Sequence, residues 1–174
     1  MKITLEKPNL NRKDSYLLFV DECRKETTVL VPFVLKYPTD DFEAFIRVFE
    51  NCENGIGLPE GFVPHVTYWL VVDEEVVGVS NLRLRLNESL LRIGGHIGYG
   101  VKPSARRKGY ATIMLRETLI KAKEYGIDLC MVTCNKENIA SAKTILNNGG
   151  ALDSEEYLDE IKETIQRYWI KFKG

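Results

Sequence analysis

The sequence predicts a single α/β domain over residues 1–174, of the mixed α+β type with helices on the faces of a sheet. Its 174 residues are 44 % apolar and 28 % charged, which suits one globular domain. The hydrophobic periodicity along the chain predicts helices and strands in the order α-α-β-β-β-α-β-α-β-β, which is typical of a sheet covered by helices. No internal repeat, low-complexity tract or linker divides the chain.

Two helices are predicted in the first third of the chain. Residues 14–25 carry an approximate apolar stripe. Residues 40–53 are clearer, because apolar side chains recur at i, i+3, i+4 and i+7 and two carboxylates stand at the start, where they favour a helix N-terminus. Those positions are Phe42, Phe45, Ile46 and Phe49, after Asp40 and Asp41. Glycines and prolines then predict a loop over residues 51–64.

Three strands are expected next. Residues 66–72 and 76–86 are rich in β-branched and aromatic residues, and residues 73–75 form the turn between them. A third strand is predicted over roughly residues 92–101, ending before Pro103. These three strands form a meander.

The second half begins with a helix over about residues 109–125, which Gly126 stops. Residues 127–133 are nearly all apolar, which indicates a central strand covered on both faces. Asn138 is a good N-cap for a helix that ends at residues 147–149. Two final strands are predicted over about residues 151–159 and 163–172.

Composition and charge exclude several classes of function. The 24 Lys+Arg balance 25 Asp+Glu, so no global field favours DNA or an anionic membrane. No apolar run reaches the length of a membrane span, and residues 1–8 lack the apolar core of a signal peptide. We therefore expect a cytoplasmic protein with no nucleic-acid partner and no membrane partner.

The four cysteines agree with a reducing compartment. The spacing of Cys23, Cys52, Cys130 and Cys134 matches neither a disulfide framework nor a zinc site, so no metal is expected. Cys130 and Cys134 share one face of a predicted strand, where two buried thiols are far more common than a redox pair.

The chemistry is concentrated in residues 97–111. There a strand ends, a turn offers the cations Arg106, Arg107 and Lys108, and Gly109 opens a helix. Free backbone N–H groups and the helix dipole make such a helix N-terminus an anion site, which glycine lets a phosphate approach closely. The spacing matches neither a Walker A loop nor a dinucleotide-binding Gly-x-Gly-x-x-Gly. Three basic residues alone would more often form a solvated patch, but the strand-turn-helix context favours an anion site.

The segment Arg106-x-x-Gly109-x-Ala111 resembles the pyrophosphate loop of the GNAT superfamily of acyl-CoA-dependent N-acetyltransferases. The order of helices and strands over about residues 3–172 is also similar to that family. The resemblance implies a GNAT-like fold with a central, mostly antiparallel sheet and helices on both faces. It also implies acetyl-CoA as cosubstrate.

The resemblance assigns cofactor-binding roles by position. Backbone groups of Tyr99, Gly100 and Val101 are expected to pair with pantetheine, because this strand should splay from the next one. The loop from Arg106 to Thr112 is expected to bind the pyrophosphate, and Asn138 to touch the pantetheine arm. This set is Tyr99, Gly100, Val101, Arg106, Arg107, Lys108, Gly109, Tyr110, Ala111, Thr112 and Asn138.

Two positions concern acid–base chemistry. Many GNAT members carry a general-acid tyrosine seven residues after the asparagine, where this sequence has Ile145. The acid is therefore absent or supplied elsewhere, by Tyr99, Tyr110 or water. His96 occupies the slot in which several GNAT enzymes have a glutamate base, so it is the candidate catalytic base. An equally weighted alternative is a histidine whose hydrogen bonds are satisfied by a neighbouring strand.

These observations predict an N-acetyltransferase in which an acceptor amine attacks acetyl-CoA directly. The acceptor is a small-molecule or peptide amine. The acidic segment 37–60 would favour a cationic one, although a solvated helix face explains the segment more simply. Because Ile145 replaces the tyrosine, the alternative is a non-catalytic acyl-CoA-binding sensor or interaction module. A homodimer is left open.

Overall fold

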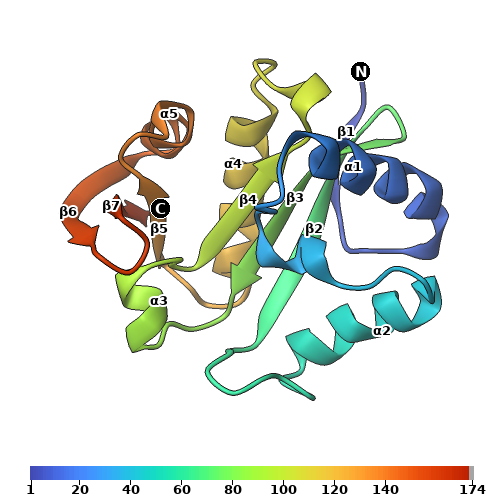
Figure 1. Ribbon diagram of the computed structural model, residues 1–174, viewed down its shortest axis with the longest axis horizontal. Helices are drawn as coiled ribbons and strands as arrows, with labels where there is room; N and C mark the ends of the chain where they lie inside the picture. Colours follow the sequence, from blue (N-terminus) through green and yellow to red (C-terminus); the bar gives the residue numbers. More distant parts are fainter. Residues whose placement is uncertain (173–174) are drawn as a thin grey trace.

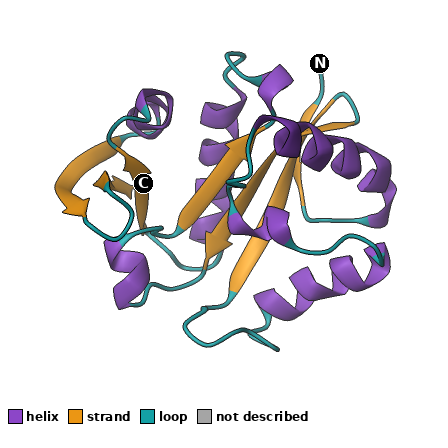
Figure 2. Ribbon diagram, in the orientation of Figure 1, coloured by secondary structure: helices purple, strands orange, loops and turns teal. Residues whose placement is uncertain are grey.

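The computed structural model describes residues 1–172 and contains two antiparallel sheets (Figures 1 and 2). The first sheet has the strand order β1-β2-β3-β4 and the second has the order β5-β7-β6. The strands are β1 Ile3–Glu6, β2 His65–Val72, β3 Glu75–Arg83, β4 Ile97–Val101, β5 Leu129–Asn135, β6 Gly150–Leu158 and β7 Glu163–Lys171. The α-helices are α1 Lys13–Glu26, α2 Phe42–Glu53, α3 Glu88–Arg92, α4 Tyr110–Glu124 and α5 Ile139–Asn147. The 3₁₀ turns are η1 Leu10–Arg12, η2 Phe33–Lys36 and η3 Pro103–Ala105.

Strand β2 explains why helices cover both faces of the first sheet. All eight of its residues are buried, and alternate side chains point to opposite faces. Trp69 and Val71 join the aromatic cluster of α1 and α2, whereas Leu70 and Val72 pack with Met114 of α4. Figure 1 shows α1 and α2 on one side of this sheet and α4 on the other. The mixed α/β class and its helix-covered, antiparallel sheet are confirmed.

The two sheets separate between β4 and β5. An isolated bridge joins Gly95 to Val132, and the N–H of His96 donates to the carbonyl of Met131 at 2.8 Å. Beyond this point no ladder joins β4 to β5 within the described residues, and Figure 1 shows the strands diverging. The nearly all-apolar segment after α4 is therefore not the predicted central strand. It is a mostly buried edge strand at the junction between the sheets, and β7 is the middle strand of the second sheet.

Several predicted ends follow local signals. Asp41 accepts a hydrogen bond from the N–H of Ala44 and caps α2, and Asn138 accepts one from Ser141 and caps α5. Gly126 adopts φ +76° directly after the Tyr125 C-cap of α4. All four cysteines are free and buried.

Two sequence-based expectations about elements were wrong. Residues 92–96 are not strand, because α3 occupies 88–92, with Asn87 as its N-cap, and Gly94 and Gly95 then take positive φ angles. Residues 3–6 form β1, which the sequence analysis missed. Four residues are too few to display a clear alternation, and β1 is defined by its pairing with β2. Within residues 1–172, no helix combines the length and apolarity needed to cross a membrane.

Candidate active site

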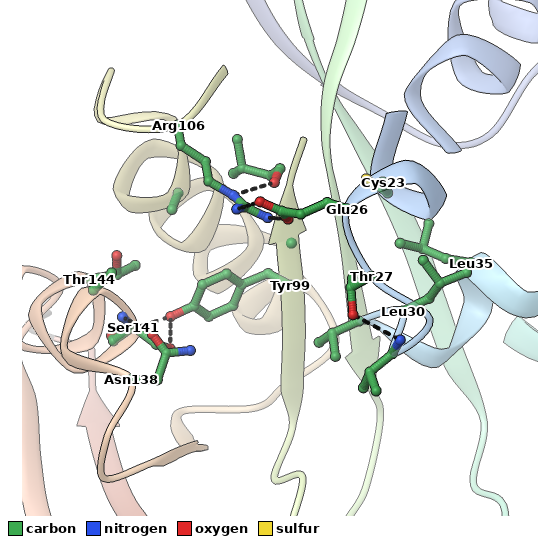
Figure 3. Close-up of a pocket in the computed structure, with 16 residues that line it drawn as sticks. Cys23, Glu26, Thr27, Leu30, Leu35, Tyr99, Arg106, Asn138, Ser141 and Thr144 are labelled. Atoms are coloured by element: carbon green, nitrogen blue, oxygen red, sulfur yellow. Dashed lines mark hydrogen bonds and ion pairs between the residues drawn. The ribbon is translucent and has the colours of Figure 1, made fainter. Parts of the chain in front are cut away.

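A cavity of about 470 Å³, hereafter the large cavity, opens between β4, the start of α4, α5 and the segment that joins α1 to η2 (Figure 3). Four separate parts of the sequence therefore build it. The residues that line it include Glu26, Val31, Tyr99, Gly100, Val101, Arg106, Ala111, Asn138, Ser141 and Thr144.

The free edge of β4 supplies backbone groups to this cavity. The N–H of Lys102 donates to Val77 on β3, and alternate residues of an antiparallel strand point to opposite sides. The backbone groups of Tyr99 and Val101 therefore point away from β3, toward the gap beside β5. The carbonyl of Val101 accepts from Arg106 Nε at 3.3 Å, on this same side. The divergence of the sheets thus leaves N–H groups that an extended ligand can use.

The start of α4 is a stretch of unpaired backbone donors. The N–H groups of residues 107–112 donate to no acceptor within residues 1–172, and Gly109, the N-cap, offers no side-chain cap. Gly109 adopts φ +79°, and open space surrounds the position that a Cβ would take. The exposed cations Arg107 and Lys108 flank this N-terminus. The residues present therefore fit a bound phosphate or pyrophosphate.

Polar side chains of α5 form the wall opposite α1. Asn138, Ser141 and Thr144 follow one another at helical spacing and line the cavity. The hydroxyl groups of Tyr99 and Ser141 hydrogen-bond at 2.8 Å, so the Tyr99 ring lies across the floor between β4 and α5 (Figure 3). Burial raises the pKa of Tyr99 to about 12.

An ion pair spans the opening of the cavity. Arg106 donates two hydrogen bonds to Glu26, at 2.7 and 2.6 Å, and thereby ties the start of the α4 turn to the end of α1 (Figure 3). Its side chain is therefore already occupied. The backbone N–H groups that follow Arg106, rather than its guanidinium, are the free donors of this turn.

His96 lies outside the large cavity. It is 7 % exposed, and its Nδ1 accepts a hydrogen bond from the N–H of Met131 at 3.0 Å. The ring proton is thus on Nε2, and the neutral ring has no free lone pair with which to take a proton. Burial, assisted by the charge of Arg83, lowers the pKa of His96 to about 4. These observations favour the structural alternative for His96 over the role of base.

The two tyrosine alternatives for the acid differ in position. The hydroxyl of Tyr110 is directed at Met1 Sδ, 3.8 Å away, and Tyr110 is not among the lining residues, whereas Tyr99 is. Ile145 is fully buried in the cluster that holds Leu115 and Tyr168. A side chain at position 145 therefore points into the core, and its neighbour Thr144 faces the cavity.

The structure brings together part of the predicted set. Tyr99, Gly100, Val101, Arg106, Ala111 and Asn138 line the large cavity, while Arg107, Lys108, Gly109, Tyr110 and Thr112 lie at the adjoining turn and first turn of α4. The acidic residues of segment 37–60 line neither this cavity nor the second one described below. Sequence reasoning missed Ser141 and Thr144, which the helical spacing from Asn138 could have revealed. It also missed the wall at residues 26–35, for which no motif exists.

A split antiparallel sheet with unpaired donors at the start of the following helix is the arrangement that the resemblance to GNAT enzymes predicts. The GNAT acetyltransferase domain model matches residues 3–151. The chain therefore belongs to the GNAT acetyltransferase family and is a GNAT-type N-acetyltransferase. No curated protein gives a significant sequence match.

Solved structures agree in fold at low sequence identity. A ribosomal L7/L12 alpha-N-protein acetyltransferase, RimL, in complex with coenzyme A superposes with a TM-score of 0.71 at 17% identity over 99% of this chain and 95% of that chain. Microcin C7 self immunity acetyltransferase MccE, in complex with acetyl-CoA and AMP, superposes with a TM-score of 0.70 at 16% identity. The match covers 98% of this chain and 93% of that chain. A third match is an acetyltransferase from Salmonella typhimurium that modifies the N-terminal serine of the 50S ribosomal subunit protein L7/L12. It superposes with a TM-score of 0.69 at 14% identity over 99% of this chain and 96% of that chain.

Proposed function

We propose that the large cavity binds acetyl-CoA and that the loop from Arg106 to Thr112 holds its pyrophosphate. The observation that carries this proposal is the run of unpaired N–H groups over residues 107–112, at a helix start flanked by two cations. The pantetheine arm then lies along the free edge of β4, where amide groups can pair with the backbone of Tyr99 and Val101. Asn138 lies beside this arm while its side chain caps α5.

The acetyl group passes to the acceptor by direct attack. The lone pair of an unprotonated amine forms the C–N bond, the C–S bond breaks, and the surplus proton leaves through water. The N–H of Val101 meets the oxyanion of the tetrahedral intermediate, since it points into the gap and is part of a fixed strand. Coenzyme A departs as a thiolate, because its thiol resembles that of cysteine, whose pKa is about 8.5.

Direct attack by an unprotonated amine needs no base from the protein. This agrees with the large cavity, where the described lining residues offer no free carboxylate and no histidine. Among the described lining residues, Glu26 is the one carboxylate, and it is paired with Arg106. The transfer rate should therefore rise as the pH increases through the pKa of the acceptor amine. The pH–rate profile should show no second titration from a base of the protein.

Thiol release from acetyl-CoA, measured with a library of amines and with mass spectrometry of the products, tests this function. We expect acetylated product and free coenzyme A in equal amounts for at least one amine class. Calorimetry on the same preparation measures coenzyme A affinity. Tight binding without turnover of any amine would favour the non-catalytic acyl-CoA sensor that Ile145 suggests.

A further inference from the structure

A second, smaller cavity of about 170 Å³ lies where β2 begins and β3 ends, between η2, the loop before β2 and α3. We call it the small cavity. Its wall is firm, because Asn87 caps α3 and also donates to the carbonyl of Gly61 in the loop. The residues that line it are Phe33, Gly61, Phe62, Val63, His65, Arg83, Ser89 and Leu90.

Arg83 is the one charged side chain among these lining residues, and it has no acidic partner. Its Nη1 donates to the carbonyls of Gly94 and Gly95, at 3.0 and 3.1 Å, while Nε and Nη2 donate to no group of residues 1–172. By contrast, Arg12, Arg92, Arg106 and Arg167 each pair with a carboxylate. Burial lowers the pKa of Arg83 only to about 10, so it stays charged at neutral pH.

His65 lines the same cavity, and its ring carries an enclosed nitrogen without a hydrogen-bond partner. It is 1 % exposed, and its Nδ1 faces the amide nitrogen of Asn81 at 2.8 Å. An amide nitrogen only donates, so Nδ1 accepts and the ring proton is on Nε2. That Nε2 is buried and has no hydrogen-bond partner in the described chain. Asn81 Oδ1, on the amide that contacts this ring, is also buried without a hydrogen-bond partner.

The two cavities are neighbours along β4. A Cβ at Gly98 would lie 3.6 Å from Arg83 Nη2 and 3.6 Å from Pro32, whereas a Cβ at Gly100 would meet the carbonyl oxygen of Val31 at 2.2 Å. Val31 lines the large cavity and Phe33 the small one, so segment 31–33 crosses β4 between them. Gly98 and Gly100 are about 7 Å apart along an extended strand.

We infer that the small cavity binds the carboxylate of the acceptor, so that the acceptor is an amino acid or a related amino carboxylate. The planar fork of the Arg83 guanidinium matches a carboxylate, and Phe33 and Phe62 enclose the apolar part of the acceptor. Segment 31–33 covers β4 between the two cavities, so the amine has to reach past Pro32 and Val31 to the large cavity. This inference rests on the proposed transfer from acetyl-CoA. An amino carboxylate replaces the cationic acceptor that the acidic segment 37–60 suggested, because the carboxylates of that segment line neither cavity.

Matched ligands test the inference on the unaltered protein. Proteinogenic and short ω-amino acids are each compared with their own carboxamide at equal concentrations of free amine. We expect kcat/KM to favour the carboxylate by roughly tenfold to a hundredfold, the range for a hydrogen-bonded charged group. Equal rates for acid and carboxamide would overturn the inference. An aminoalkyl phosphonate that outperforms its carboxylate counterpart would overturn the assignment to a carboxylate.

Two variants with the same change of charge locate the effect. Arg83→Gln should raise KM for the amino acid at least tenfold, remove the preference over the carboxamide and leave coenzyme A affinity unchanged. Arg85→Gln is the control, since Arg85 is exposed, is on the same chain segment and lines neither cavity. Circular dichroism checks that both variants fold. An Arg83→Gln protein that is folded and keeps the preference would refute the role of Arg83.

Calorimetry separates this inference from the proposed function. Amino acids and carboxamides are titrated into the protein without acetyl-CoA. Carboxylate binding that Arg83→Gln abolishes supports the small cavity as the subsite even if no amine is acetylated, and such a lack of turnover would count against the transferase proposal alone. No binding of any amino carboxylate, together with turnover of other amines, would overturn the inference and leave the proposed function standing.

Discussion

The large and small cavities lie on either side of segment 31–33 but are built from different groups. At the large cavity the free donors are backbone N–H groups at the start of α4 and along the edge of β4. At the small cavity they are side-chain nitrogens of Arg83 and His65, held by carbonyls and an amide. Backbone N–H donors depend on the local conformation and not on side-chain identity, so they suit a ligand that is the same in every reaction cycle. Side-chain donors can be exchanged by single substitutions, which suits the selection of an acceptor.

The largest expected effect lies in the backbone-built site. Gly109→Glu places a carboxylate in the open space at the N-terminus of α4, against the pyrophosphate, and we expect coenzyme A affinity to fall by roughly a hundredfold or more. Gly126→Glu is the matched control, because it has a similar positive φ and similar open space at the other end of α4. Calorimetry on both variants makes the comparison. Equal affinities would contradict the assignment of the loop.

His96 tests whether the junction between the two sheets is structural or catalytic. His96→Ala leaves the N–H of Met131 without its acceptor and should cost about 1–3 kcal/mol of unfolding free energy, measured by denaturant titration. His96→Asn, whose Oδ1 can replace Nδ1, should recover most of this loss. A folded His96→Ala protein with full stability and a turnover defect that shrinks at high pH would instead restore the role of base.

The same histidines predict how stability depends on pH. Burial lowers the pKa values of His65 and His96 from 6.5 to about 4, so the folded state favours the neutral rings. Their contribution is present above pH 6.5 and is lost as pH falls from about 6.5 toward 4, because the unfolded chain binds protons first. Thermal unfolding across this range should show the decline, and His96→Asn should reduce it. A flat profile would contradict the buried neutral rings.

An effect on stability of similar size, without an effect on turnover, is expected at position 145. Ile145→Tyr inserts a larger side chain into a full core rather than into the large cavity, and should cost about 1–3 kcal/mol without raising turnover. Leu146→Tyr controls for the residue type, since Leu146 is 52% exposed. Thermal melts and steady-state rates measure both effects. Increased turnover in Ile145→Tyr would mean that a tyrosine at this position reaches the departing thiolate.

The smallest effect is expected at Tyr99. Tyr99→Phe keeps the ring across the floor of the large cavity and removes the hydrogen bond to Ser141, which contributes about 0.5–1.5 kcal/mol. Turnover should change little if the thiolate leaves unassisted. A large loss confined to kcat, with coenzyme A affinity intact, would identify Tyr99 as the general acid.

Local signals determined most of the elements and the turn before α4. Caps such as Asp41 and Asn138, and the stop at Gly126, act within a few residues of themselves, so the linear pattern is enough to locate them. The Arg106-x-x-Gly109-x-Ala111 pattern likewise lies within one strand-turn-helix unit, which is why it could be assigned from the sequence. The weak local signals, at β1 and α3, were the ones missed or misassigned.

The sequence by itself therefore determined the family, the four longer helices α1, α2, α4 and α5, and the strand-turn-helix unit that contains Gly109. Tertiary structure alone decided that His96 uses its lone pair on Met131, that Ile145 points into the core, and that Arg83 lies beside His65 without a carboxylate. Each of these outcomes depends on which distant segment packs against the residue. Burial and hydrogen-bond partners are properties of that packing, and no pattern of neighbouring residues encodes them.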